Sequence, residues 1–153
     1  MLKLFQYNWQ VRDEWFLLCR SLTKGQLIEQ HIGGMGSILK TFFHIVEVEY
    51  SWIRVLQGEP DIVLEFKDYM ELELLQKLSA ELHPKFSSFL GNWLSELEAK
   101  PTLPSWTNES FTQGEILRHI LVHEIHHVGQ LSIWAKELGL PVISTDFIGR
   151  GLN

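Results

Sequence analysis

Apolar side chains recur at helical spacing in four segments of this 153-residue chain, and no segment shows the alternation that is typical of a strand. The first segment covers residues 4–22 and the second covers residues 37–56. Glycines at positions 33, 34 and 36 disfavour a helix before the second segment. Gly58 and Pro60 then predict its end.

The third periodic segment, residues 69–98, carries regularly spaced leucine and aromatic side chains. Pro84 is expected to bend or split it, because proline removes a helical hydrogen bond and clashes with the preceding turn. The fourth segment has the clearest ends. Thr112 and Glu115 fit a capping box at its start, and Gly139 followed by Pro141 ends it.

These segments predict one all-α domain over residues 1–153, folded as an antiparallel four-helix bundle. No internal repeat or low-complexity tract divides the chain. The stretch 100–110 is expected to be the longest ordered connection between helices.

Histidines lie on the apolar faces of two of the predicted helices. His123 and His127 are four positions apart and fall about 20° on either side of the centre of the apolar stripe, at 100° per residue. His44 lies on a narrow face of the second helix, where small side chains leave room beside its ring. The other residues of that face are Ser37, Val48, Ser51 and Val55.

Two imidazoles at i and i+4 are close enough to converge on one ion, and a third histidine from another helix would complete a set of three. Such a set leaves coordination positions open, which is typical of a catalytic metal centre. A single core histidine is more often a hydrogen-bonded packing residue. Two unpaired buried imidazoles, however, cost a few kcal/mol, and a shared cation satisfies both.

Several polar residues lie near this candidate centre. Glu47, one turn from His44, is a candidate to orient a ligand ring or to act as a catalytic base. His119 and His126 lie on the flank of the stripe and are expected to be solvated or to support the ligands. Gln130 is expected to hydrogen-bond inside the bundle, and Glu124 is expected at the surface.

Composition narrows the classes of partner. A net charge of −6, a pI near 5.6 and the lack of a basic run argue against nucleic acid or a membrane surface as the main partner. The single Cys19 is expected to be a small buried hydrophobic residue. The first residues do not resemble a signal peptide and no apolar run is long enough to span a bilayer, so a cytoplasmic location is expected.

The string from His119 to Gln130 resembles the signature of the DinB/YfiT-like metalloprotein superfamily, a pattern of the form HxxxHxxHHxGQ in the last helix. The segment from His44 to Glu47, followed by Trp52, resembles the histidine segment of the family's second helix. Other positions that fit are Trp9, Pro141, Asp146 and Phe147.

The resemblance implies a bundle of up-down-down-up topology that holds zinc, nickel or iron through His44, His123 and His127. It also implies a homodimer. Some members are S-transferases or isomerases that use bacillithiol, mycothiol or glutathione, and many have no assigned reaction. Val128 stands where an arginine is common, and that arginine is a candidate anchor for an anionic thiol.

Two hypotheses of function follow. The first is a metal-dependent enzyme of thiol S-transferase or hydrolase type that acts on a small molecule, with Glu47 as its base and a low-molecular-weight thiol as a candidate cosubstrate. The second is a non-catalytic, stress-associated bundle whose metal site is structural or vestigial. Chelation discriminates between them, because removal of a structural ion costs folding free energy.

Overall fold

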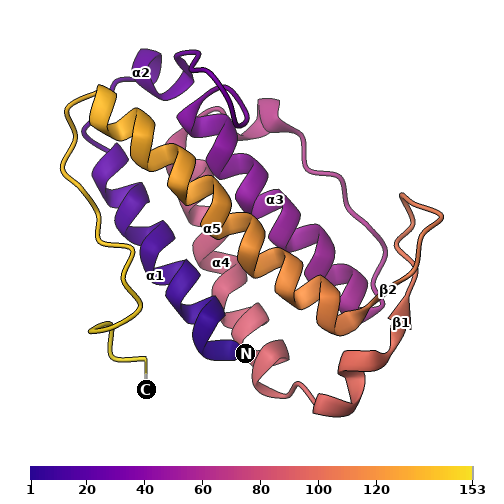
Figure 1. The fold of residues 1–153 in the computed structure, drawn as a ribbon. Helices are drawn as coiled ribbons and strands as arrows, with labels where there is room; N and C mark the ends of the chain where they lie inside the picture. Colours follow the sequence, from indigo (N-terminus) through magenta and orange to yellow (C-terminus); the bar gives the residue numbers. More distant parts are fainter. Residues whose placement is uncertain (153) are drawn as a thin grey trace.

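Four long helices lie side by side in the computed structural model, which describes residues 1–152 (Figure 1). They are α1 (Leu2–Cys19), α3 (Ile38–Gln57), α4 (Leu72–Gly91) and α5 (Gln113–Glu137). α1 and α5 run in one direction and α3 and α4 in the other, so the order is up-down-down-up (Figure 1). The all-α, four-helix architecture predicted from the sequence is confirmed.

The connections follow from this topology. Because α3 and α4 run in the same direction, residues 58–71 return the chain to the other end of the bundle and include the 3-10 helix η1 (Phe66–Tyr69). The short helix α2 (Lys24–Ile28) and the glycine-rich stretch link α1 to α3. The connection from α4 to α5 contains η2 (Ser95–Ala99) and the stretch 100–110.

The same connection also contains two strands that the sequence did not predict. β1 (Pro101–Thr102) pairs antiparallel with β2 (Phe111–Thr112), with Pro101 opposite Thr112. No segment of the sequence shows the alternation that is typical of a strand. A strand of two residues is too short to give a period of two in the sequence, so no alternation could reveal it.

The start of α5 lies where the sequence predicts it, whereas α4 ends earlier than predicted. The capping box of α5 is confirmed, since Thr112 Oγ1 accepts from the amide of Glu115 and Thr112 N donates to Glu115 Oε2. The third segment was predicted over 69–98, but α4 ends at Gly91. Pro84 lies inside α4 without splitting it, because Leu82 and Phe86 on either side are buried in the core.

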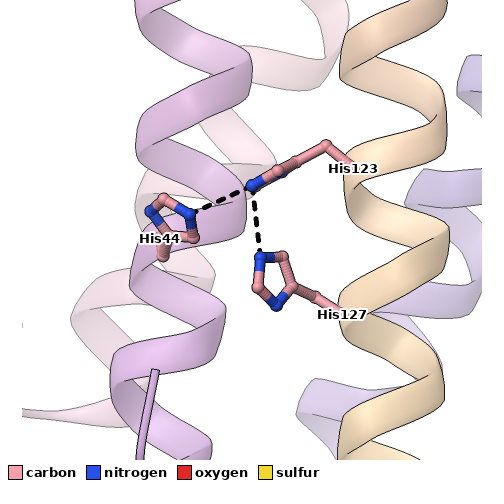
Figure 2. A group of neighbouring side chains, drawn as sticks. All are labelled: His44, His123 and His127. Atoms are coloured by element: carbon pink, nitrogen blue, oxygen red, sulfur yellow. Dashed lines mark hydrogen bonds between the residues drawn. The ribbon is translucent and has the colours of Figure 1, made fainter. Parts of the chain in front are cut away.

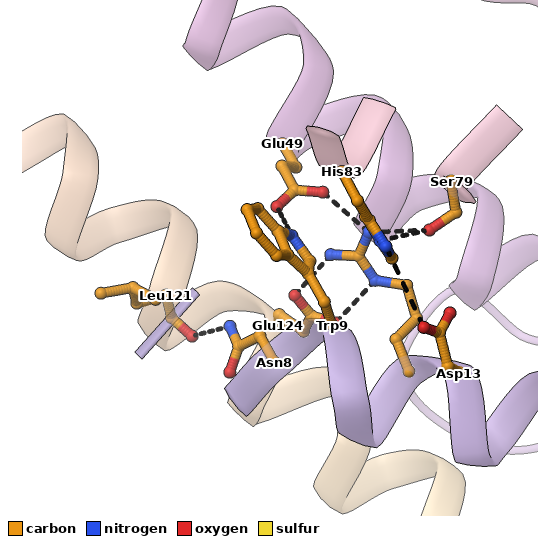
Figure 3. Close-up of polar contacts among 9 residues, drawn as sticks. Asn8, Trp9, Asp13, Glu49, Ser79, His83, Leu121 and Glu124 are labelled. Carbon is orange, nitrogen blue, oxygen red and sulfur yellow. Dashed lines mark hydrogen bonds and ion pairs between the residues drawn. The ribbon is translucent and has the colours of Figure 1, made fainter. Parts of the chain in front are cut away.

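A charged network crosses the core between α1, α3 and α5 (Figure 3). Arg12, which is 1% exposed, donates to Glu49 Oε2 at 2.7 Å and to both oxygens of Glu124 at 2.7 and 2.6 Å. Trp9 Nε1 donates to the other Glu49 oxygen at 2.7 Å. The prediction that Glu124 is at the surface was wrong, because its carboxylate pairs with a buried guanidinium.

His83 extends this network toward α4. Its Nε2 lies 3.0 Å from Ser79 Oγ, which also accepts from Arg12, and its ring stacks on Trp9 with the centroids 4.9 Å apart. Burial and the nearby positive charge of Arg12 lower the pKa of His83 to about 4. The ring is therefore neutral at pH 7.

This neutral histidine predicts a loss of stability in mild acid. The pKa of His83 is lower in the folded chain than its ordinary value of 6.5, so the unfolded chain binds more protons between those values. Between pH 7 and pH 4 the free energy of unfolding of the wild type should fall by about 2–3 kcal/mol more than that of His83→Gln. Urea titrations at several pH values measure this difference, and parallel curves for the two proteins would contradict it.

Two further findings bear on function. Cys19 is fully buried, as predicted, and burial raises the pKa of its thiol to about 12, so it is a poor nucleophile. Among residues 1–152, no helix combines the length and the apolar character that a membrane crossing requires.

Candidate metal centre

His44, His123 and His127 meet where α3 packs against α5 (Figure 2). His44 projects from α3, and the other two project from successive turns of α5. Nε2 of His123 lies 3.0 Å from Nε2 of His44 and 3.2 Å from Nε2 of His127. The structure thus brings together the three residues selected from the sequence.

The geometry fits a shared cation. One ligand atom from each of the three residues lies within 4.8 Å of the other two. In a tetrahedral zinc site with Zn–N distances of about 2.0–2.1 Å, neighbouring ligand nitrogens are separated by about 3.3 Å. The two short separations here are close to that value. Three ring nitrogens that face one another leave no room for a hydrogen on each, whereas three lone pairs directed at one ion are compatible with this arrangement.

The protonation states of His123 and His127 are also those of metal ligands. Burial, with the neighbouring His127 and His44 rings, lowers the pKa of His123 to about 3. Burial likewise lowers the pKa of His127. Both rings are neutral at pH 7, and neutral imidazole is the form that binds metals.

Gln130 fixes the orientation of His127. Nδ1–H of His127 donates to Oε1 of Gln130 at 2.7 Å, which leaves Nε2 as the nitrogen with the free lone pair. The amide nitrogen of Gln130 in turn donates to His126 Nε2 at 3.1 Å. The predicted hydrogen bonding of Gln130 is confirmed, and His126 supports the centre through this amide. His119 packs against His123 with ring centroids 5.6 Å apart.

The glycine-rich stretch before α3 leaves room for Gln130. Gly34 has a φ of +51°, and a Cβ added there would lie 2.6 Å from Oε1 of Gln130 and 3.0 Å from the ring of Trp134. Only glycine allows this close approach without strain. Gly34 therefore leaves space for the side chain that orients His127, a candidate ligand.

Gly34→Ala should weaken metal binding without removing any ligand. The new methyl group displaces Gln130, His127 loses the partner that fixes its ring, and affinity for the ion should fall by about 10–100-fold. Competition with a chromogenic chelator measures the affinity. Gly33→Ala is the matched control, because Gly33 also has a positive φ (+89°) but has no atom within 4 Å of the added Cβ. Equal losses in the two variants would show that backbone strain alone is responsible.

A cavity of about 280 Å³ lies beside His44 along the same face of α3. Its lining residues are Glu47, Val48, Ser51, Trp52, Asp61 and Trp106. Glu47 Oε2 lies 3.7 Å from Nδ1 of His44, so Glu47 belongs to both the cavity and the centre. The small residues on the His44 face thus leave the space that their size predicted.

The string from His123 to His127 also satisfies the HExxH spacing of zinc metalloproteases. In those enzymes the glutamate is the general base next to the ion. Here Glu124 points into the core, and both of its oxygens bond to Arg12. Glu124 therefore cannot act as the general base. Within residues 1–152, the only carboxylate found within 4 Å of a ring nitrogen of the triad is that of Glu47.

Comparison with known proteins identifies the family. The sequence profile of the DinB family matches residues 1–150. The chain belongs to the DinB family. YizA of Bacillus subtilis (strain 168), an uncharacterized protein, is 46% identical over 154 residues that span all of this DinB chain and 97% of YizA.

Two solved structures share the fold of this DinB chain. A DinB-like protein from Bacillus cereus ATCC 10987 superposes with a TM-score of 0.72 at 13% identity, covering 92% of this chain and 91% of that one. YfiT from Bacillus subtilis, described as a probable metal-dependent hydrolase with an unusual four-helix bundle topology, gives a TM-score of 0.70 at 18% identity. That match covers 91% of this chain and 87% of YfiT.

Sequence reasoning missed two groups of residues. Asp61 and Trp106 lie in connections between helices, where no periodicity places them against α3. Glu49 did leave a signal, because it lies on the apolar side of its helix with Val46 and Ile53. The burial of Arg12 and Glu124 shows only once the helices are packed together.

Proposed function

We propose that this protein is a divalent-metal-dependent hydrolase of small molecules, with His44, His123 and His127 as metal ligands and Glu47 as catalytic base. The observation that carries the proposal is the convergence of three Nε2 atoms next to an open cavity. The family membership and the description of YfiT as a probable metal-dependent hydrolase support it. Zinc or nickel suits three imidazoles best, and iron is also compatible.

A divalent ion held by three neutral imidazoles keeps its full +2 charge and supplies a Lewis acid that lowers the pKa of a coordinated nucleophile toward neutrality. The chain's own residues supply the rest. Glu47, next to His44 and facing the cavity, accepts the proton of the attacking water and passes it to the leaving group. Trp52 and Trp106 form apolar walls that confine the substrate beside the centre.

The cavity favours water over a thiol as the nucleophile. Glutathione and similar low-molecular-weight thiols carry carboxylates that require basic partners. The titratable residues that line this cavity, Glu47 and Asp61, are both acidic, so they repel an anionic cosubstrate. Val128, in place of the family's common arginine, agrees with this preference. A thiol S-transferase is the second candidate, and it predicts thiol-dependent turnover of a chlorodinitrobenzene-type electrophile.

Glu47→Gln should lower kcat for hydrolysis of an activated ester by about 100-fold or more, because the amide cannot accept the proton. Metal content should stay at one ion per chain, since Glu47 is not a ligand in this account. Stopped assays on untagged, metal-loaded protein measure the rate, and elemental analysis measures the ion. Full activity in Glu47→Gln would remove Glu47 from the proposed mechanism.

The non-catalytic alternative makes a different prediction for chelated protein. A structural ion contributes several kcal/mol to folding, so its removal should lower the melting temperature strongly. The hydrophobic core contains 29 buried residues drawn from all four long helices, and a core of this size stabilises a domain without an ion, so we expect the chelated chain to stay folded. Homodimer formation and a cytoplasmic location stay predictions.

A further inference from the structure

We propose that the cavity beside the candidate metal centre is a recognition site for a small organic cation, so that the substrate carries an ammonium group. Its lining combines two tryptophans with two carboxylates. The part of this inference that concerns the substrate rests on the proposed function. The cation site itself rests on the cavity alone.

The aromatic walls supply ring surface that attracts ammonium groups. The rings of Trp52 and Trp106 pack edge to face, with centroids 5.1 Å apart and an interplanar angle of 77°, so they meet at a corner of the cavity lining. The electron-rich faces of aromatic rings attract cations, and tryptophan does so most strongly. Trp106 is 45% exposed, which leaves its ring open to a ligand.

The carboxylates supply negative charge that no neighbouring side chain neutralises. Oδ1 of Asp61 is buried and has no hydrogen-bond partner among residues 1–152, which is costly for a polar oxygen unless a ligand group binds near it. Within residues 1–152, neither Glu47 nor Asp61 forms an ion pair with lysine or arginine. Arg54, which lies between Glu47 and Asp61 in the sequence, is engaged by Glu59 and by the carbonyl of Pro60.

The position of the cavity sets the length of the substrate. Glu47, Ser51 and Trp52 follow His44 along one face of α3, and a helix rises 1.5 Å per residue. The lining residues therefore begin about 4–5 Å from His44 and extend to about 12 Å along the helix axis. Trp52 marks the far end of this range, so a substrate with its ammonium group in the aromatic corner needs a chain long enough to place its hydrolysable group at the histidines.

Binding of choline tests the cation site against a neutral analogue of the same shape, 3,3-dimethylbutan-1-ol. Tryptophan fluorescence and NMR titrations of the full chain should show choline binding at least about ten-fold more tightly. His44→Ala, which disrupts the candidate centre, should keep this preference. Asp61→Asn and Trp106→Ala should each reduce choline affinity about ten-fold. Asp68→Asn, which removes an exposed carboxylate from the same connection, should not.

Turnover tests whether the site serves the reaction. The metal-loaded protein should hydrolyse 6-(trimethylammonio)hexyl acetate, which is long enough to reach from the aromatic corner toward the histidines, with a kcat/KM about ten-fold or more above that of its neutral analogue 7,7-dimethyloctyl acetate, and Asp61→Asn should remove the difference. Equal binding of choline and its neutral analogue, or equal turnover of the two esters, would overturn the inference. If choline is preferred in binding but neither ester is hydrolysed, the proposed function fails and the cation site stands.

Discussion

Replacing His123 with alanine should release the divalent ion and abolish turnover. The ring of His123 lies between the other two, with its Nε2 within 3.2 Å of both partners, so its loss removes the central ligand. Loss of a residue that merely supports a ligand already costs 10–100-fold in affinity. We therefore expect a loss of about 100-fold or more for this variant. Elemental analysis of untagged protein after dialysis should give less than one tenth of an ion per chain.

His119→Ala is the matched control for that experiment. His119 lies one turn before His123 on α5 and packs against its ring, but it is not part of the converging set. This variant should retain one ion per chain. Release of the ion from His119→Ala together with retention in His123→Ala would show that the ligand set has been assigned wrongly.

Arg12→Ala should destabilise the fold by about 3–5 kcal/mol, a large share of the 5–15 kcal/mol that holds a typical domain together. The variant leaves Glu49 and Glu124, both about 2% exposed, without their cation in the core. Urea denaturation measures the change in the free energy of unfolding. The loss should be smaller in the triple variant Arg12→Met/Glu49→Leu/Glu124→Leu, in which no buried charge remains.

Arg20→Ala provides the comparison at the exposed end of α1. The side chain of Arg20 donates to Gln76 at the surface and forms no ion pair among residues 1–152, so its replacement should cost less than about 1 kcal/mol. A similarly small cost for Arg12→Ala would mean that the buried network contributes little and that its glutamates are accommodated by protonation or by water.

Much of the helical framework could be predicted because its signals are local. The apolar stripe and the capping box of α5 gave its extent, and the face of α3 that carries His44 followed from a period of 3.6. The two histidines at i and i+4 on α5 had to be neighbours in any helix. Sequence reasoning therefore selected the three residues that the structure brings together.

The rest depends on contacts between distant segments. Glu124 was expected at the surface because a carboxylate is rarely buried, and only its pairing with Arg12 reverses that expectation. The end of α4 at Gly91 and the placement of Trp106 against Trp52 are set by tertiary packing, for which a single sequence has no periodic signal. The role of Gly34 likewise became clear only through its contact with Gln130.

Anomalous diffraction from crystals of untagged protein, grown with zinc or nickel and collected on both sides of the metal's absorption edge, tests the central claim most directly. We expect one strong anomalous peak per chain, about 2.0–2.1 Å from Nε2 of His44, His123 and His127. A fully loaded crystal with no peak among these three rings, or with its only peak elsewhere, would contradict it.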